Sequence, residues 1–203
     1  MIGILDYGLG NLASVGAAIE HLGFPGCLIS HGGGLDAAEK LIIPGVGAFG
    51  DAMQKLGDRD LIEPLHHFAL EKRRPVLGIC LGFQLMAREG TEFGTHAGLG
   101  WIEGTVHRLS PEGHLRIPHV GWNDLFQRGE SILFRDVPDD ALFYYTHSFH
   151  LRCDDPAIVK GTCDYGGEFT AAVERDNICG LQCHPEKSQQ WGLQVLKNFL
   201  ELK

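Results

Sequence analysis

The first half of the chain alternates short apolar runs with segments of helical periodicity. A helix is predicted after the first run, because apolar residues recur at helical spacing behind Asn11, a residue that can cap a helix. A second helix is predicted over 61–72, with Pro64 in its first turn, where proline is tolerated. The apolar runs themselves predict buried strands at 2–5, 27–30, 40–43 and 75–79. This alternation indicates a parallel sheet covered by helices.

The second half is dominated by runs typical of strands and closes with an amphipathic helix. Arg175-Asp176-Asn177 indicates a hairpin turn, and Trp191, Val195, Leu196 and Phe199 mark the apolar face of the last helix. The expected strands lie at 101–109, 115–120, 141–151, 158–162, 169–174 and 179–183. We therefore predict an α/β fold, with an open, mostly parallel central sheet flanked by helices and added antiparallel strands in the second half. The length suits one domain over residues 1–203.

Composition excludes several classes of function. The net charge of −9 argues against a nucleic-acid partner, which would need a basic face. No apolar run approaches the length of a membrane span, and no basic segment precedes an apolar stretch at the N-terminus. The six cysteines are scattered without the spacing of a disulfide framework, which favours a reduced, cytoplasmic location.

A candidate nucleophile lies where the fourth predicted strand ends. Cys80 stands at a strand-to-helix corner in Gly78-Ile79-Cys80-Leu81-Gly82, with a helical pattern expected over 81–87. This is the thiol counterpart of the G-x-S-x-G nucleophile elbow, in which glycines leave room for a tight turn. The positive end of the following helix favours the thiolate. Taken alone, the motif fits a structural cysteine equally well.

The segment His184-Pro185-Glu186 supplies the remaining members of a possible triad. A catalytic cysteine needs a base, and the base needs a group that orients it. In extended backbone His184 and Glu186 point to the same side, and Pro185 favours that conformation. Glu186 can then bond one ring nitrogen while the other faces the thiol. We therefore predict a triad of Cys80, His184 and Glu186.

The sequence does not favour two other chemistries, metal binding and nucleotide binding. Cys179, Cys183 and His184 could suggest zinc, but they contain no C-x-x-C pair, so we expect no metal. The stretches 8–13 and 45–50 imitate a dinucleotide fingerprint. Neither is followed by an acidic residue at the end of the next strand, so we expect no cofactor. The amides of 44–47 are better suited to complete an oxyanion hole with the amide of Leu81.

The G-x-C-x-G corner and the distant His-Pro-Glu resemble the class I (triad) glutamine amidotransferases. More narrowly, several segments resemble the family of glutaminase subunits of imidazole glycerol phosphate synthase, an enzyme of histidine biosynthesis. Anthranilate-synthase-type and pyridoxal-phosphate-synthase-type glutaminases lack the elements 121–123 and 187–189. The resemblance runs nearly end to end through 4–12, 44–53, 118–123, 145–148 and 184–189.

This resemblance implies hydrolysis of L-glutamine by acyl transfer. His184 would take the proton of Cys80, and the thiolate would attack the side-chain amide. The oxyanion would rest on the amides of Leu81 and, after a backbone rearrangement, Val46. By family position, the residues that hold glutamine would be Gln84, Glu92, His147 and Ser148.

A partner chain is also implied. Ammonia in water is mostly ammonium, a poor nucleophile, so it must travel by a sheltered path. Little chain follows Glu186, so we expect the acceptor site on another chain. In the family this partner is a cyclase subunit with a (β/α)8-barrel fold. The positions that match its interface are Trp122, Asn123, Tyr144 and Lys187.

Three alternatives stay open. Phe83, Phe149 and Cys183 depart from the residues usual in the family, which leaves room for a paralogous glutaminase that feeds another acceptor synthase, for example in surface-sugar synthesis. A non-catalytic binding subunit would not need the whole triad. A free cysteine hydrolase would act without a partner.

Overall fold

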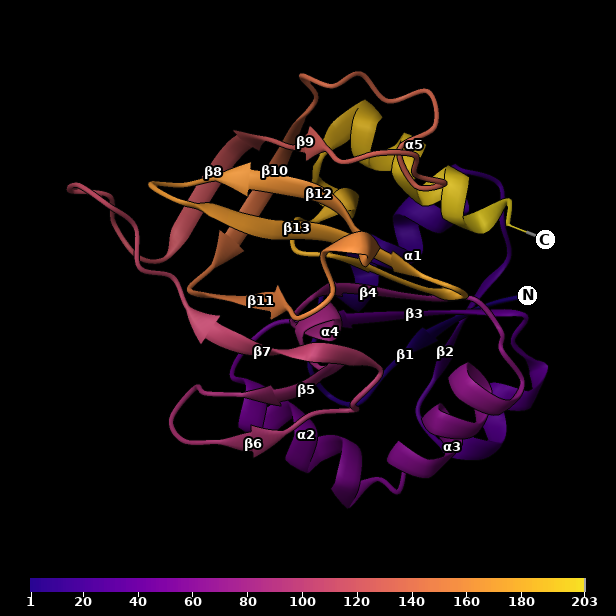
Figure 1. The fold of residues 1–203 in the computed structure, drawn as a ribbon. Coiled ribbons are helices and arrows are strands. Elements are labelled where there is room, and N and C mark those ends of the chain that lie inside the picture. The colour runs from indigo at the N-terminus through magenta and orange to yellow at the C-terminus, as the bar shows by residue number, and fades with distance from the viewer. Residues whose placement is uncertain (203) are drawn as a thin grey trace.

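The computed structural model describes residues 1–202 as three sheets, with helices on both faces of the largest (Figure 1). The central sheet has the order β2-β1-β3-β4-β14-β13-β12-β9, and its first five strands are parallel. The remaining strands join antiparallel, which confirms the predicted fold class. In sheet order, the strands are Gly26–Ile29, Ile2–Leu5, Lys40–Gly45, Val76–Cys80, Ile178–Leu181, Glu168–Arg175, Val159–Asp164 and Phe126–Gln127.

Two hydrophobic cores lie on opposite faces of this sheet. Because successive side chains of a strand alternate between faces, Ile4 packs into one core and Leu5 into the other. The first core is covered by α1 (Leu12–His21) and α5 (Gln189–Leu200). The second is covered by α2 (Phe49–Asp58), by α3 (Ile62–His66) and by the π-helical turn His67–Glu71 that continues it. The predicted helices over 61–72 and near the C-terminus are confirmed, whereas α2 was not predicted.

The middle of the chain forms the two smaller sheets. One pairs β8 (His119–Asp124) with β10 (Leu142–His147). The other has the order β11-β7-β5-β6, with bounds Phe149–Cys153, Ile102–Arg108, Ala87–Gly90 and His96–Ala97. Short 3-10 turns at Gly32–Ala37, Pro156–Ile158 and Pro185–Lys187 complete the described elements.

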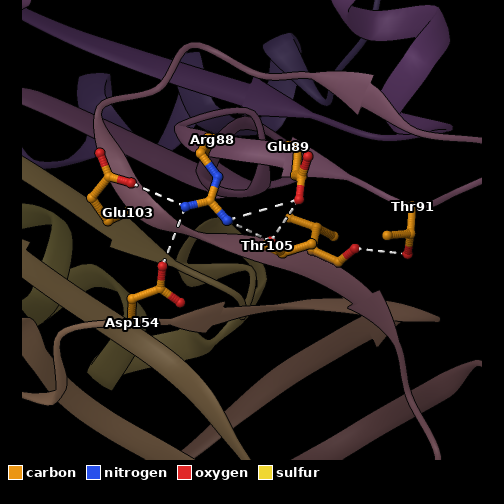
Figure 2. A network of polar contacts seen from close by, with 7 residues as sticks. Arg88, Glu89, Thr91, Glu103, Thr105 and Asp154 are labelled. Atoms are coloured by element: carbon orange, nitrogen blue, oxygen red, sulfur yellow. Dashed lines mark hydrogen bonds and ion pairs between the residues drawn. The ribbon is translucent and has the colours of Figure 1, made fainter.

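An exposed polar network joins strands of the four-stranded sheet. Figure 2 shows the guanidinium of Arg88 on β5 between the carboxylates of Glu103 on β7 and Asp154 after β11, at 3.2 and 3.4 Å. Solvent screens such exposed pairs, and each is worth roughly 0–1 kcal/mol. The network therefore orients the outer face of this sheet and adds little stability.

Three predicted elements differ in the structure. The helix expected over 81–87 is the single turn α4 (Leu81–Gln84), and β5 already begins at Ala87. Every residue of 81–87 is buried, so no amphipathic period marks where the helix ends. The strand expected from 115 begins only at His119, since Pro118 has no amide hydrogen to donate to a ladder. The run 141–151 is divided at Ser148 into β10 and β11, which belong to different sheets.

Asn11 also differs from its predicted role. Its side chain makes no capping bond to the backbone of α1; its oxygen instead accepts from the Ser14 hydroxyl at 2.9 Å. No helix within residues 1–202 is long and apolar enough to cross a lipid bilayer.

Candidate active site

The backbone turns sharply at Cys80, between the end of β4 and the start of α4. Cys80 has φ +54°, a left-handed conformation that costs a non-glycine residue roughly 1–3 kcal/mol. The flanking glycines are required by close packing. A Cβ on Gly78 would lie 2.6 Å from the Cα of Phe83, and a Cβ on Gly82 would overlap the carbonyl oxygen of Ile43. The corner predicted from sequence is therefore present, and the thiol sits at its apex.

His184 reaches this corner from the neighbouring strand. Strand β14 runs parallel to β4 with Leu181 opposite Ile79, so the carboxyl ends of both strands meet at one edge of the sheet. The Nδ1 of His184 lies 2.8 Å from the Oε1 of Glu186, and the exposed fractions of these side chains are only 2% and 1%. Asn11 contributes a longer contact of 3.5 Å from its Nδ2 to the same carboxylate oxygen.

The opposite ring nitrogen of His184 is buried and has no hydrogen-bond partner within residues 1–202. Burial is the largest influence on the pKa of His184 and lowers it, but the nearby Cys80 and Glu186 outweigh burial and raise this pKa to about 9. Cys80 thus lies near enough to act on the charge of the ring, although no bond between the two is formed. The surroundings of His184 thus stabilise the charged form of its ring.

The thiol opens onto a pocket of about 270 Å³ at the carboxyl edge of the sheet. The structure brings to this pocket the predicted nucleophile, both predicted oxyanion residues and all four predicted glutamine ligands, whereas His184 and Glu186 do not line it. The lining residues are Val46, Gly47, Cys80, Leu81, Gln84, Glu92, Pro118, Thr146, His147, Ser148 and Phe149.

Internal hydrogen bonds hold several of the lining side chains. The Oε2 of Glu92 accepts from the amide of Phe49 at 2.9 Å, at the N-terminus of α2, where a carboxylate is favoured. The carbonyl of Phe149 accepts from Gln84 Nε2 at 2.8 Å and from His147 Nδ1 at 2.9 Å. These bonds fix the side chains before any ligand arrives.

A second buried histidine, which the sequence analysis missed, supports His147. The Nδ1 of His119 lies 3.2 Å from the Nε2 of His147, and the two residues are paired across β8 and β10. Because the Phe149 carbonyl can only accept, His147 carries its proton on Nδ1, and His119 must donate to its Nε2. Burial lowers the pKa of His119 to about 4 and that of His147 to about 3, so both rings are neutral near pH 7.

Three of the four residues predicted at a partner interface, Trp122, Tyr144 and Lys187, gather on one outer face. The rings of Trp122 and Tyr144 lie edge to face at 6.0 Å, and the Nζ of Lys187 lies 5.6 Å from the centre of the Tyr144 ring. Trp122 is 45% exposed, a large area for a tryptophan. Asn123 differs from the other three, since it donates to the Asp164 carbonyl at 2.8 Å.

The glycine-rich stretches pack against the same corner. A Cβ on Gly10 would lie 3.2 Å from the carbonyl oxygen of Pro44, and one on Gly45 would lie 2.9 Å from the Cβ of Leu81. Close packing thus accounts for these glycines without a nucleotide. Within residues 1–202, no three His, Cys, Asp or Glu side chains are grouped to hold a metal ion.

Comparison with known sequences defines the class of protein. The family model for class-I glutamine amidotransferases matches residues 28–202, so the chain belongs to the class I glutamine amidotransferases. The chain is 47% identical to the imidazole glycerol phosphate synthase subunit HisH of Desulfitobacterium hafniense, a match that covers 98% of this chain and 93% of the relative. It is 45% identical to the subunit of the same name from Sulfurimonas denitrificans, over 100% and 99% of the two chains.

Solved structures share the fold at lower identity. The structure of PurLQS from Thermotoga maritima has a TM-score of 0.76 and 20% identity, over 98% of this chain and 96% of that one. A structure described as a glutamine amidotransferase has a TM-score of 0.74 and 19% identity, over 98% and 97%. At this level of identity, the structural similarity supports the assignment of the fold alone.

Proposed function

We propose that this chain is the glutaminase subunit of an imidazole glycerol phosphate synthase, with Cys80, His184 and Glu186 as its catalytic triad. The observation that carries the proposal is the buried 2.8 Å contact between His184 and Glu186, near a strained cysteine that opens onto a pocket. The relatives named above, at 45–47% identity over almost the whole chain, support the assignment to this synthase.

The chemistry begins with removal of the Cys80 proton by His184. The thiolate attacks the side-chain carbonyl carbon of glutamine, and the carbonyl oxygen becomes an oxyanion. His184 then returns the proton to the nitrogen, which leaves as ammonia, and Cys80 holds a glutamyl thioester. Water, activated by His184, hydrolyses that thioester to glutamate and restores the thiol. Glu186 orients the ring and stabilises its charged form throughout.

The oxyanion needs preorganised donors. Leu81 begins α4 directly after the nucleophile, the position of the first oxyanion amide in a nucleophile elbow. The amide of Val46 is the second donor, after the backbone of the segment 44–47 rearranges. Gly47, at φ +112°, gives this segment the freedom to turn, because glycine accepts backbone angles that other residues refuse.

The pocket suits a free amino acid. Its volume of about 270 Å³ lies just below the usual range for small-ligand sites, roughly 300–1,000 Å³. In this proposal Gln84, Glu92, His147 and Ser148 hold L-glutamine. No cofactor takes part.

The released ammonia goes to a partner, the cyclase subunit with a (β/α)8-barrel fold. Trp122, Asn123, Tyr144 and Lys187 form the docking face. On the cyclase subunit, the ammonia reacts with a phosphorylated ribulosyl formimino nucleotide to give imidazole glycerol phosphate and an aminoimidazole carboxamide nucleotide. We further propose a cytoplasmic location and a single domain over residues 1–203.

The test combines the chain with a cyclase subunit, the nucleotide substrate and glutamine. We expect glutamate and imidazole glycerol phosphate to form in equal amounts. Glutamate release that is stimulated only by a different acceptor synthase, and not by the cyclase, would instead identify the paralogous glutaminase. Full turnover without any partner would identify a free hydrolase.

A further inference from the structure

We propose that Gln182 is a positioning residue for the nucleophile, whose buried amide donates a hydrogen bond to the sulfur of Cys80 and stabilises the thiolate that forms there. The inference deepens the proposed function, on which it rests. Gln182 precedes the predicted base by two residues, and its side chain reaches the back of the corner.

The sheet places Gln182 beside the nucleophile. Strands β14 and β4 are parallel, and their register pairs Leu181 with Ile79. The next residue along each strand is Gln182 and Cys80, so the two are neighbours at the carboxyl edge. Gln182 is fully buried, and its Nε2 lies 3.7 Å from the Cys80 Sγ, within range of a hydrogen bond to sulfur.

The surrounding bonds fix which end of the Gln182 amide faces the sulfur. The carbonyl of Phe149 can only accept, so the atom of Gln84 that lies 2.8 Å from it must be the amide nitrogen. That nitrogen also lies 3.0 Å from Gln182, whose facing atom must therefore be the oxygen. The amide nitrogen of Gln182 is then left to donate to Cys80.

This donor favours the charged form of the sulfur. A hydrogen bond to an ionised acceptor is roughly twice as strong as one to a neutral acceptor, so an N–H aimed at the sulfur stabilises the thiolate more than the thiol. The bond assists two steps of the reaction. The first is the formation of the thiolate before attack, and the second is the departure of the thiolate from the second tetrahedral intermediate. Gln182 does not line the substrate pocket, so its own side chain contacts the sulfur and not the bound glutamine.

The direct test measures the reactivity of Cys80 without any substrate. The full-length chain is treated with iodoacetamide between pH 5 and 10, and modification is followed for each cysteine by peptide mass spectrometry. Partly exposed Cys27 serves as an internal reference. In Gln182→Met, which removes the donor at similar length, we expect the alkylation rate of Cys80 near pH 7 to fall by roughly tenfold, the effect of one hydrogen bond to a charged group. The pH of half-maximal rate should rise by about one.

Matched variants separate this effect from a folding defect. Asn198 is also a buried amide, and it donates to the Leu133 and Arg135 carbonyls away from the pocket. Asn198→Leu should cost stability yet leave the alkylation profile of Cys80 unchanged. Gln182→Glu keeps an oxygen for Gln84 but places a negative charge beside the sulfur, so it should slow alkylation further. A Cys80 profile equal to wild type in both folded Gln182 variants would overturn the proposal.

Glutamine turnover supplies the second readout. In Gln182→Met we expect kcat to fall by roughly tenfold with little change in KM, whereas a residue that binds glutamine would raise KM. A rise in KM with kcat unchanged would also overturn the positioning role. If the wild-type chain had no glutaminase activity even in complex with the cyclase subunit, the function proposed above would fail, while the alkylation profiles would still decide the role of Gln182.

Discussion

The Nδ1 atom of His184 lies 2.8 Å from the Oε1 atom of Glu186, and both side chains are almost completely withdrawn from solvent. A carboxylate is seldom buried without a partner, because removing its charge from water is costly. Each residue of the pair therefore depends on the other, because removing either one would leave a buried polar group without its partner. The first two predictions follow from this relationship.

Replacing Glu186 with Gln should leave the fold intact and reduce glutamine turnover. The amide has the same shape, but it cannot stabilise the positive charge that His184 carries during the reaction. We expect kcat to fall by roughly a hundredfold or more, with KM changed much less. Turnover at saturating glutamine, measured in the complex, checks this. An unchanged kcat would mean that some other group orients His184.

Alkaline pH should weaken the native state through His184. Its pKa in the folded chain is about 9, above the ordinary value of 6.5, so the folded state holds a proton that the unfolded state has lost. The stabilisation is complete below pH 6.5 and disappears as the pH rises through 9. Urea unfolding of wild type at several pH values should show this decline, and Glu186→Gln should flatten it. Parallel pH profiles for the two proteins would contradict the assignment.

The parallel half of the fold, the corner at Cys80 and the contact between His184 and Glu186 could be predicted from the sequence, because local patterns mark each of them. Cys80 is marked by its glycines, and the His-Pro-Glu segment by its spacing. No local sequence pattern of this kind identifies Gln182 or His119. Each residue reaches the site only because two strands pair, β14 with β4 for Gln182 and β8 with β10 for His119. A single sequence does not reveal the register of these pairs.

Glu92 illustrates a different limit. The resemblance assigned it to the glutamine pocket, and it does line that pocket, but it also accepts the Phe49 amide at the start of α2. Neither helix α2 nor that bond was predicted. Since the two residues are far apart in the chain, only the folded structure shows that one carboxylate can serve both the pocket and the helix.

Substituting Gly82 with Ala should destabilise the corner. The added Cβ would overlap the Ile43 carbonyl on β3, and a backbone atom cannot move aside as a side-chain end can. Overpacking of this kind costs roughly 1–3 kcal/mol in the free energy of unfolding. Gly16→Ala on α1 is the matched control, because its Cβ would meet only Ile4 at an ordinary 3.8 Å and alanine favours a helix. Equal stability of the two variants would refute the packing argument.

The isolated chain should be a poor glutaminase that its partner switches on. The backbone amide of His184 donates to the Tyr144 carbonyl at 2.8 Å, and the Tyr144 ring contacts Trp122 and Lys187 on the outer face. A partner seated on that face can therefore act on the site. One missing oxyanion donor costs roughly 3 kcal/mol, so the cyclase with an acceptor analogue should raise turnover by about a hundredfold or more.

The switch is checked by glutamate release from the chain alone, from the complex, and from the complex with the analogue. Trp122→Ala should reduce the stimulation and leave the slow rate of the isolated chain unchanged. Comparable turnover in all three states would rule the switch out and favour a free hydrolase.

The central claim is that Cys80 releases ammonia from glutamine and does nothing else in the synthase. The most direct measurement is the rate of imidazole glycerol phosphate synthesis by the complex carrying Cys80→Ala, with glutamine and, separately, with ammonium salts as the nitrogen source. We predict that glutamine-dependent synthesis falls by roughly a thousandfold or more, whereas ammonia-dependent synthesis stays at the wild-type rate. Retention of glutamine-dependent synthesis, or an equal loss of both activities in a folded complex, would contradict the account.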